Sequence, residues 1–141
     1  MSTPLKVVYV AAAALKNKAG DVLLAQRPEG KAAAGLWEFP GGKIETGETP
    51  EEALKREMVE ELAVDIDVED MQPLTFVSHR YDEYGFHLVM FLYGVKKWQG
   101  EPNPQENQNF KWVKEADFQS YSIIAPPADV PLFEFLDEHP F

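Results

Sequence analysis

The stretch Gly41–Val64, GGKIETGETPEEALKREMVEELAV, decides the fold of this chain. A pair of glycines is followed by a short polar loop and then by the signals of a helix start. Thr49 and Glu52 have the spacing of a Thr-x-x-Glu capping box, and Pro50 stands at a first helical position, where a missing N–H costs nothing. The stretch therefore predicts a turn at the glycines and a helix that begins at Pro50.

The predicted helix carries three carboxylates on one side. At about 100° per residue, Glu57, Glu60 and Glu61 fall within one sector, because spacings of three and four residues share a helix face. An adjoining stripe is apolar and consists of Leu54, Met58 and Leu62. One edge of the helix is therefore expected to pack on a core while the next edge presents the acids.

These acids have two interpretations. Glutamate is a good helix former, and most acidic helix faces are simply solvated. Three crowded carboxylates repel each other, however, and a hard divalent cation such as Mg²⁺ or Mn²⁺ would remove that repulsion, since it prefers carboxylate oxygens. Arg56, four residues before Glu60, can pair with the acids and orient them. The pattern indicates a candidate metal site, with a solvated helix as the alternative.

The same stretch resembles the signature of the Nudix hydrolases, Gly-x5-Glu-x7-Arg-Glu-U-x-Glu-Glu-x-Gly-U, where U is aliphatic. The positions that match in register are Gly42, Glu48, Arg56, Glu57, Met58, Glu60, Glu61 and Val64. Ala63 departs from the pattern, because the family has glycine there, where it would ease a left-handed cap. So many fixed positions make the signature highly specific, and the chain is identified as similar to the family's MutT-like members.

The resemblance implies a set of metal ligands. They are Glu57, Glu60, Glu61, the backbone carbonyl of Gly41 and, in its Gly-Glu-Pro loop context, Glu106. The metal is expected to be Mg²⁺ or Mn²⁺, which binds carboxylates together with substrate phosphates. A solvated loop residue is the alternative for Glu106.

The resemblance also implies catalytic roles around the metal. Glu48 and Arg56 are expected to orient the metal-binding acids. Glu57, Glu60 and Glu106 are all candidates for accepting the proton of the attacking water. A general base must first lie within hydrogen-bond distance of that proton, and only then does its pKa decide.

Four residues outside these acids are candidates for binding substrate. Arg27 has the Ala-x-Arg context of MutT-like members, where the arginine lies near phosphate and base; an ordinary surface charge is the alternative. Lys43 is expected to act with Arg27 on the departing pyrophosphate. Phe39 is either core or a ring that stacks on a base.

Asp129 is the fourth, and it has two interpretations. An aspartate before a helix is a good N-cap. Its segment also resembles the base-reading segment of MutT-like enzymes, where asparagine often stands in its place. An ionised aspartate only accepts hydrogen bonds, so Asp129 favours a base that offers amino or ring N–H donors, such as cytosine or some guanine faces.

The implied activity is that of a metal-dependent nucleoside triphosphate pyrophosphohydrolase, which releases a nucleoside monophosphate and pyrophosphate. Resemblance favours removal of 8-oxo-dGTP from the nucleotide pool, a function in DNA repair. The alternative is a pyrophosphohydrolase of CTP or a modified pyrimidine nucleotide. A more remote alternative is a non-catalytic Nudix-like module that binds nucleotides or recognises lesions, although such modules usually lose signature acids and this chain keeps them.

Composition sets the remaining expectations. The 141 residues suit one domain, 1–141. The chain has no cysteine, which favours the cytoplasm, and its net charge of −11 argues against binding nucleic-acid polymers. The apolar run Val7–Leu15 is too short to span a membrane, and a first strand is favoured over a signal peptide. The sequence leaves open a monomer or a homodimer.

The rest of the chain alternates apolar runs and turns. The expected strands are Val7–Leu15 and Val22–Arg27 as one hairpin, Leu36–Pro40, Asp65–Val68, then Leu74–Arg80 and Phe86–Val95 as a second hairpin, and Phe110–Val113. A short turn or helix is expected at Glu115–Phe118 and a terminal helix at Val130–Glu138. This order predicts an α/β fold, an α/β/α sandwich around a central mixed sheet, which is also the fold implied by the Nudix resemblance.

Overall fold

The computed structural model describes residues 5–30, 34–122 and 124–141. Its strands are β1 (Lys6–Leu15), β2 (Val22–Gln26), β3 (Trp37–Glu38), β4 (Gly41–Lys43), β5 (Met71–Tyr81), β6 (Phe86–Val95) and β7 (Phe110–Val113). Its helices are α1 (Pro50–Leu62), α2 (Phe118–Ser122) and α3 (Val130–Glu138), and short 3-10 turns cover Val68–Asp70, Asp82–Tyr84 and Glu115–Asp117.

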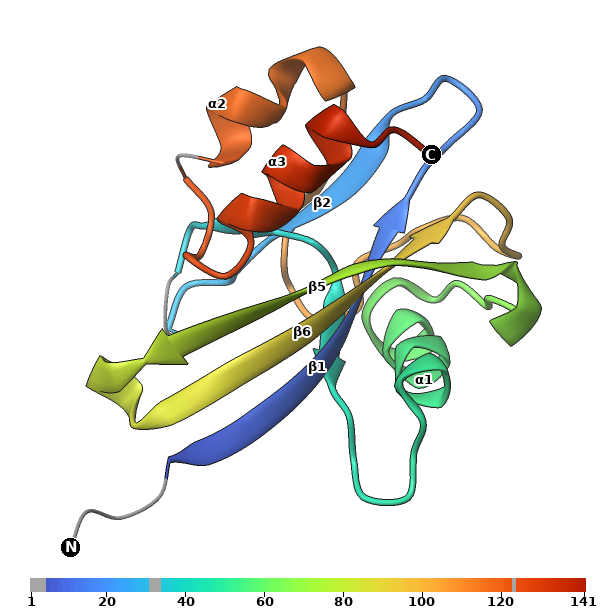
Figure 1. The fold of residues 1–141 in the computed structure, drawn as a ribbon. Coiled ribbons are helices and arrows are strands. Elements are labelled where there is room, and N and C mark those ends of the chain that lie inside the picture. The colour runs from blue at the N-terminus through green and yellow to red at the C-terminus, as the bar shows by residue number, and fades with distance from the viewer. Residues whose placement is uncertain (1–4, 31–33, 123) are drawn as a thin grey trace, which may run out of the picture.

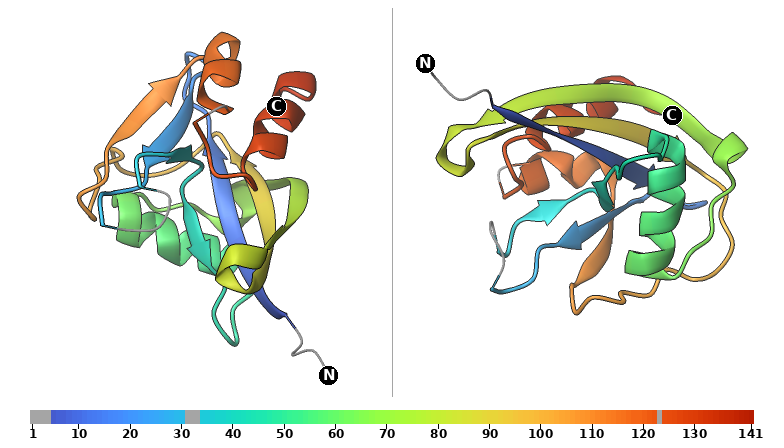
Figure 2. Two further views of the ribbon diagram at one scale, coloured as in Figure 1. Left: turned by 90° about the vertical axis from the view of Figure 1, so that its left-hand side faces the viewer. Right: turned by 90° about the horizontal axis from the view of Figure 1, so that it is seen from below.

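The strands form two sheets between the helices. One sheet has the order β4-β1-β6-β5 and is mixed, since β1 runs parallel to β6 and antiparallel to β4. The other is antiparallel, with the order β3-β2-β7. Helix α1 lies on one side of the sheets and α2 and α3 on the other, as Figure 1 and the turned views of Figure 2 show. The predicted α/β/α architecture with a mixed sheet is confirmed, and a second sheet extends it.

Strand β1 separates two hydrophobic cores. Successive side chains of a strand point to opposite faces. Ala12 and Ala14 lie in the core under α3, whereas Ala11, Ala13 and Leu15 lie in the core under α1. All five are essentially inaccessible to solvent, which explains why this strand is a continuous apolar run rather than an alternating one.

Helix α1 begins at Pro50, as predicted, and both hydrogen bonds of the capping box are present. Glu52 N–H donates to Thr49 Oγ1 at 3.1 Å and Thr49 N–H donates to Glu52 Oε1 at 2.9 Å. The predicted apolar stripe is buried. The helix ends at Ala63, whose φ of 57° is the left-handed conformation that glycine would adopt more easily.

The predicted first hairpin is wrong. β1 and β2 follow each other in sequence, but they belong to different sheets and meet only through a bridge between Lys16 and Val22. β6 pairs along the whole of β1 on one edge, and β4 occupies Val10–Ala12 on the other, so β2 cannot pair along β1 as a hairpin partner would. A continuous apolar strand indicates burial on both faces, but the pattern does not identify the strands that pair with it.

Two smaller predictions also fail. Gly41 and Gly42 are not a turn, because they form strand β4 against β1. The strand expected at Asp65–Val68 is reduced to a bridge between Asp65 and Gln99, and Val68 begins a 3-10 turn.

The second half of the chain folds largely as expected. β5 and β6 form the second hairpin, β7 has the predicted bounds, and α3 spans the predicted terminal helix. Within the described ranges, no helix has the length and apolar character needed to cross a membrane.

Candidate active site

The side chain of Arg56 organises the acids of α1. Its Nε and Nη2 lie 2.7 and 2.9 Å from the two carboxylate oxygens of Glu48, a two-pronged ion pair. Its Nη1 lies 2.9 Å from Glu57 and 3.3 Å from Glu60, and Nη2 also donates to the carbonyl of Lys43 at 3.0 Å. One guanidinium thus ties the helix to the preceding loop and to β4.

Glu48 is held from both sides. The hydrogen bonds from Arg56 lower the pKa of Glu48 to about 2, and the backbone N–H of Glu45, which donates to Glu48 at 3.0 Å, adds to this effect. Glu48 is therefore ionised throughout the neutral range and keeps Arg56 in place.

The two glycines of β4 allow close approach rather than an unusual backbone. A Cβ on Gly42 would collide with the carboxylate of Glu57, and a Cβ on Gly41 would collide with the backbone of Ala11 and Ala12. Neither glycine has a positive φ. A side chain at the signature glycine would thus displace the carboxylate of Glu57, which lies directly over the strand.

Glu57, Glu60, Glu61 and Glu106 form one group of interacting charges, here called the acidic cluster. Burial raises the pKa of Glu57, as do the charges of Glu60 and Glu106, although Arg56 opposes the rise. Burial, followed by the charges of Glu57, Glu106 and Glu38, raises the pKa of Glu61 to about 9, although the Gly41 amide donates to it. Glu57 and Glu61 therefore stand in the negative field of neighbouring acids.

Glu106 reaches the cluster because its loop is fastened to the end of α1. The last carbonyls of a helix lack partners within the helix. Here the N–H of Asn103 donates to the carbonyl of Leu62 and the N–H of Gln105 to that of Glu61, both at 2.8 Å. The loop thus caps α1 and brings Glu106 to the acids, which is where the sequence prediction put it.

A second group, here called the Asp129 cluster, consists of Arg27, Glu38, Phe39 and Asp129. Arg27 at the end of β2 forms an ion pair with Glu38 of β3 at 3.2 Å. The backbone N–H of Phe39 donates to Asp129 Oδ2 at 3.0 Å, and the Phe39 ring packs against Phe133 with centroids 4.8 Å apart. Three of the four substrate-binding candidates are therefore together.

Asp129 does not cap α3, so this interpretation of it is wrong. Its backbone is helical, its side chain makes no capping hydrogen bond, and only 3% of its surface is exposed. Burial raises its pKa well above the ordinary aspartate value, and the charge of Glu38 acts in the same direction; the Phe39 amide and Arg27 oppose it. The second oxygen, Oδ1, has no hydrogen-bond partner among the described residues. Every side-chain oxygen there that is fully enclosed does have a partner. Oδ1 is therefore not fully enclosed, and it is the atom of Asp129 that keeps some exposure.

Glu38 is the site residue that the sequence analysis missed. It pairs with Arg27 and raises the pKa of Asp129 and of Glu61, so it is the member of the Asp129 cluster that also acts on the acidic cluster. Burial raises the pKa of Glu38 itself, and Arg27 opposes the rise. The signal was an acid enclosed by aromatic residues in a short strand, Trp37-Glu38-Phe39.

Lys43 and Phe39 differ in exposure. Lys43 is exposed, and its carbonyl is the atom fixed by Arg56. Phe39 is 3% exposed, which fits the core alternative, and its backbone rather than its ring contacts Asp129.

The donor set of the acidic cluster fits a hard divalent cation. Its atoms are carboxylate oxygens, and burial together with their mutual repulsion raises the pKa values of Glu57 and Glu61, a cost that a bound cation would relieve. The resemblance of the signature to that of the Nudix hydrolases implies the same kind of metal. Among the described residues no three acidic or histidine side chains already converge in a metal-holding geometry, and Arg56 contacts both Glu57 and Glu60.

Comparison with protein families matches residues 6–135 to the family described as NUDIX domain. The 8-oxo-dGTP diphosphatase of Haemophilus influenzae is 38% identical over 136 residues, covering 93% of this chain and 92% of that protein. The CTP pyrophosphohydrolase of Escherichia coli is 35% identical over 130 residues, covering 92% and 91%. A solved structure from work on MutT of Aliivibrio salmonicida and Vibrio cholerae has a TM-score of 0.78 at 30% identity, covering 94% of this chain and 98% of that one.

Proposed function

This chain belongs to the Nudix family, and on that premise we propose that it is a nucleotide-pool sanitising enzyme whose main substrate is 8-oxo-dGTP. It is a nucleotide pyrophosphohydrolase, as its relatives named 8-oxo-dGTP diphosphatase and CTP pyrophosphohydrolase support. The products are a nucleoside monophosphate and pyrophosphate. The lack of cysteine fits a cytoplasmic enzyme.

The observation that carries the proposal is the acidic cluster held by the Arg56–Glu48 pair. Mg²⁺, with Mn²⁺ as the alternative, would be held by Glu57, Glu60, Glu61, Glu106 and the carbonyl of Gly41. When bound, the metal supplies charge neutralisation for the phosphates and acidifies a water molecule.

The chain's own residues perform the remaining tasks. Arg56 contacts Glu57 and Glu60, so it restricts the orientations of both carboxylates, and Glu48 keeps Arg56 in place. Glu57, Glu60 and Glu106 are the candidates for accepting the proton of water. Arg27 and Lys43 add positive charge that stabilises the leaving pyrophosphate.

Asp129 bears on the choice of base. Because burial and Glu38 favour its protonated form, its carboxyl group can donate from a hydroxyl at Oδ1 while its other oxygen accepts, the two functions that an asparagine amide offers through Nδ2 and Oδ1. That pair of functions suits the adjacent N7–H and O6 of an 8-oxopurine. When Asp129 is ionised it only accepts, which suits the amino group of cytosine and keeps CTP or a modified pyrimidine nucleotide as the second candidate.

A substrate panel tests the proposal. The purified protein is given 8-oxo-dGTP, dGTP, CTP and 5-methyl-dCTP with Mg²⁺ or Mn²⁺, in ¹⁸O-water, and the products are identified by mass. We expect the highest kcat/KM on 8-oxo-dGTP, with a monophosphate and pyrophosphate as products. Equal kcat/KM on all four nucleotides would overturn both specific assignments, and release of orthophosphate would overturn the reaction type.

A further inference from the structure

A hollow of about 550 Å³ lies outside the candidate active site and shares no residue with either cluster. It is lined by the connection between β1 and β2, the segment that follows β6, and strand β7. Figure 1 shows the first two segments at the same end of the molecule. The residues that matter here are Lys18, Lys96, Lys97, Trp98, Glu101 and Trp112.

Two tryptophans line this hollow. The rings of Trp98 and Trp112 are nearly parallel, with an angle of 17° and a centroid separation of 6.0 Å. Both pack against the core under α1, yet both keep part of their surface exposed. A partly exposed indole that is backed by a core is a surface on which another flat ring can stack.

Three lysines give the same hollow a positive rim. Lys18, Lys96 and Lys97 are exposed, and none of them forms an ion pair in the part of the chain that the structure describes. The ammonium of Lys96 lies 5.8 Å from the centre of the Phe141 ring, a cation–π contact that does not neutralise its charge. By contrast Lys55, Arg56 and Arg80 all have carboxylate partners. In a chain with a net charge of −11, such a group of unneutralised cations is a place where an anion is attracted.

We propose that this hollow is a second, non-catalytic binding site for a nucleoside phosphate. The base stacks on the exposed indole surface, and the phosphate accepts hydrogen bonds from the lysine ammonium groups. Glu101 can accept hydrogen bonds from the ribose hydroxyls, whereas it would repel a bare anion. The volume lies within the range of roughly 300–1,000 Å³ that is usual for small-molecule sites.

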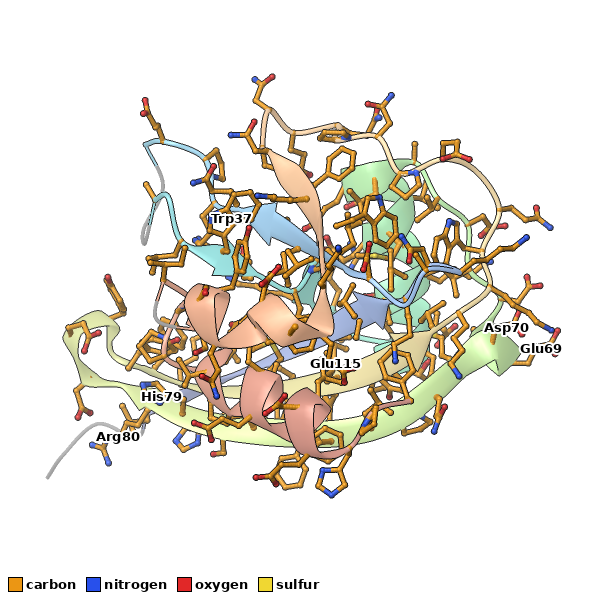
Figure 3. All side chains as sticks on the ribbon, turned by 90° about the horizontal axis from the view of Figure 1, so that it is seen from above. Trp37, Glu69, Asp70, His79, Arg80 and Glu115 are labelled. Carbon is orange, nitrogen blue, oxygen red and sulfur yellow. The ribbon has the colours of Figure 1, made fainter. Side chains whose placement is uncertain are left out.

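Acidic residues on one side of the lysines indicate where the phosphate would bind. Lys96 and Lys97 also border a smaller hollow of about 260 Å³, which includes Glu69 and Asp70. Figure 3 shows these two acids at the turn that precedes β5. Their negative charge makes the smaller hollow unsuited to an anion, so the phosphate belongs on the tryptophan side of the lysines.

Indole N–H resonances test the proposal, because the chain has 3 tryptophans and therefore three such signals. AMP is titrated into the ¹⁵N-labelled protein in the presence of EDTA, which keeps divalent metal from the acidic cluster. We expect the signals of Trp98 and Trp112 to shift saturably, with a Kd of about 0.1–1 mM. The signal of Trp37, in β3 beside the Asp129 cluster, is the internal reference for the candidate active site.

Charge reversal provides the matched comparison. Lys96→Glu with Lys97→Glu should weaken AMP binding at least about tenfold, whereas Lys114→Glu, at an exposed lysine outside the hollow, should leave it unchanged. All substituted positions are exposed, and the dispersion of the spectrum checks the fold. Unmoved Trp98 and Trp112 signals, shifts that require Mg²⁺, or equal affinity for inorganic phosphate or for adenosine alone would each overturn the proposal.

Discussion

The acidic cluster and the Asp129 cluster are assembled over very different distances in the sequence. Arg56 reaches Glu48, Glu57 and Glu60 within eight residues of itself. The hydrogen bond from Phe39 to Asp129 joins residues 90 positions apart. Apart from Glu106, which a distant loop brings to the end of α1, the first cluster is fixed by the geometry of one capped helix, and the second depends on how β3 and α3 pack together. The part of the site attributed to the reaction is therefore mostly local, while the part attributed to substrate choice is tertiary.

Glu57→Gln breaks the acidic cluster while leaving the Asp129 cluster intact. We expect kcat to fall at least about 10³-fold, because a metal-binding carboxylate over Gly42 is lost, with a smaller change in KM. Steady-state kinetics on 8-oxo-dGTP at saturating Mg²⁺ measures both constants. Glu69→Gln, at an exposed acid that belongs to neither cluster, is the matched control and should retain parental kinetics. Parental turnover by Glu57→Gln would contradict the catalytic assignment.

Arg56→Lys tests whether the acidic cluster depends on its guanidinium rather than on charge alone. Lysine cannot reproduce the two-pronged contact with Glu48 while also reaching Glu57. We expect kcat/KM to fall about 10- to 100-fold and the concentration of Mg²⁺ for half-maximal activity to rise. Thermal unfolding should show that the fold is kept.

Arg80→Lys is the control for Arg56→Lys. Arg80 forms an exposed pair with Asp82, and Figure 3 shows it on the part of β5 remote from α1. This substitution should change kcat/KM less than twofold. If both variants lost activity equally, the loss would not come from the contacts that Arg56 makes.

Asp129→Asn tests the Asp129 cluster, because it should change the choice of base and leave the acidic cluster intact. Asparagine can accept from Phe39 and still offers a donor and acceptor, so it should favour an 8-oxopurine whatever the pH. We expect the ratio of kcat/KM for 8-oxo-dGTP to that for CTP to rise about tenfold at pH 8, the equivalent of one hydrogen bond. A ratio that stays constant would contradict base reading by Asp129.

The same substitution carries a pH signature in stability. Asp129 has a higher pKa folded than the value of about 4 expected unfolded, so the folded state binds the extra proton and loses stability as pH rises above about 4. Asp129→Asn should therefore unfold at a higher temperature than the parent at pH 8, by an amount equivalent to about 1 kcal/mol or more, and the gain should vanish near pH 4. Thermal melts across this range measure it; a gain that did not depend on pH would point to packing instead.

Sequence alone predicted what depends on neighbouring residues. The start of α1, its acidic edge, the hairpin of β5 and β6, and the bounds of β7 and α3 follow from caps, spacing and turn residues. It did not predict that β1 and β2 would lie in different sheets, because apolar runs do not name partners. It missed Glu38, and it left the cap role of Asp129 open, because the ion pair of Glu38 and the burial of Asp129 arise only when β2, β3 and α3 meet.

Ala63→Gly is expected to have the smallest effect. It tests the end of α1, beside the acidic cluster, at the one position where the chain departs from the Nudix signature. Ala63 has a φ of 57° and an exposed side chain, so glycine relieves the left-handed strain without removing buried surface. We expect the free energy of unfolding in denaturant to rise by about 0.5–1 kcal/mol. The 8-oxo-dGTP to CTP ratio should stay unchanged, because the loop that carries Glu106 binds the carbonyls of Glu61 and Leu62 and not Ala63 itself. Ala116→Gly, at an exposed alanine inside a 3-10 turn, should instead lose a similar amount through chain entropy. If Ala63→Gly altered the 8-oxo-dGTP to CTP ratio, the end of α1 would be coupled to the Asp129 cluster, and the division into a local and a tertiary half would fail.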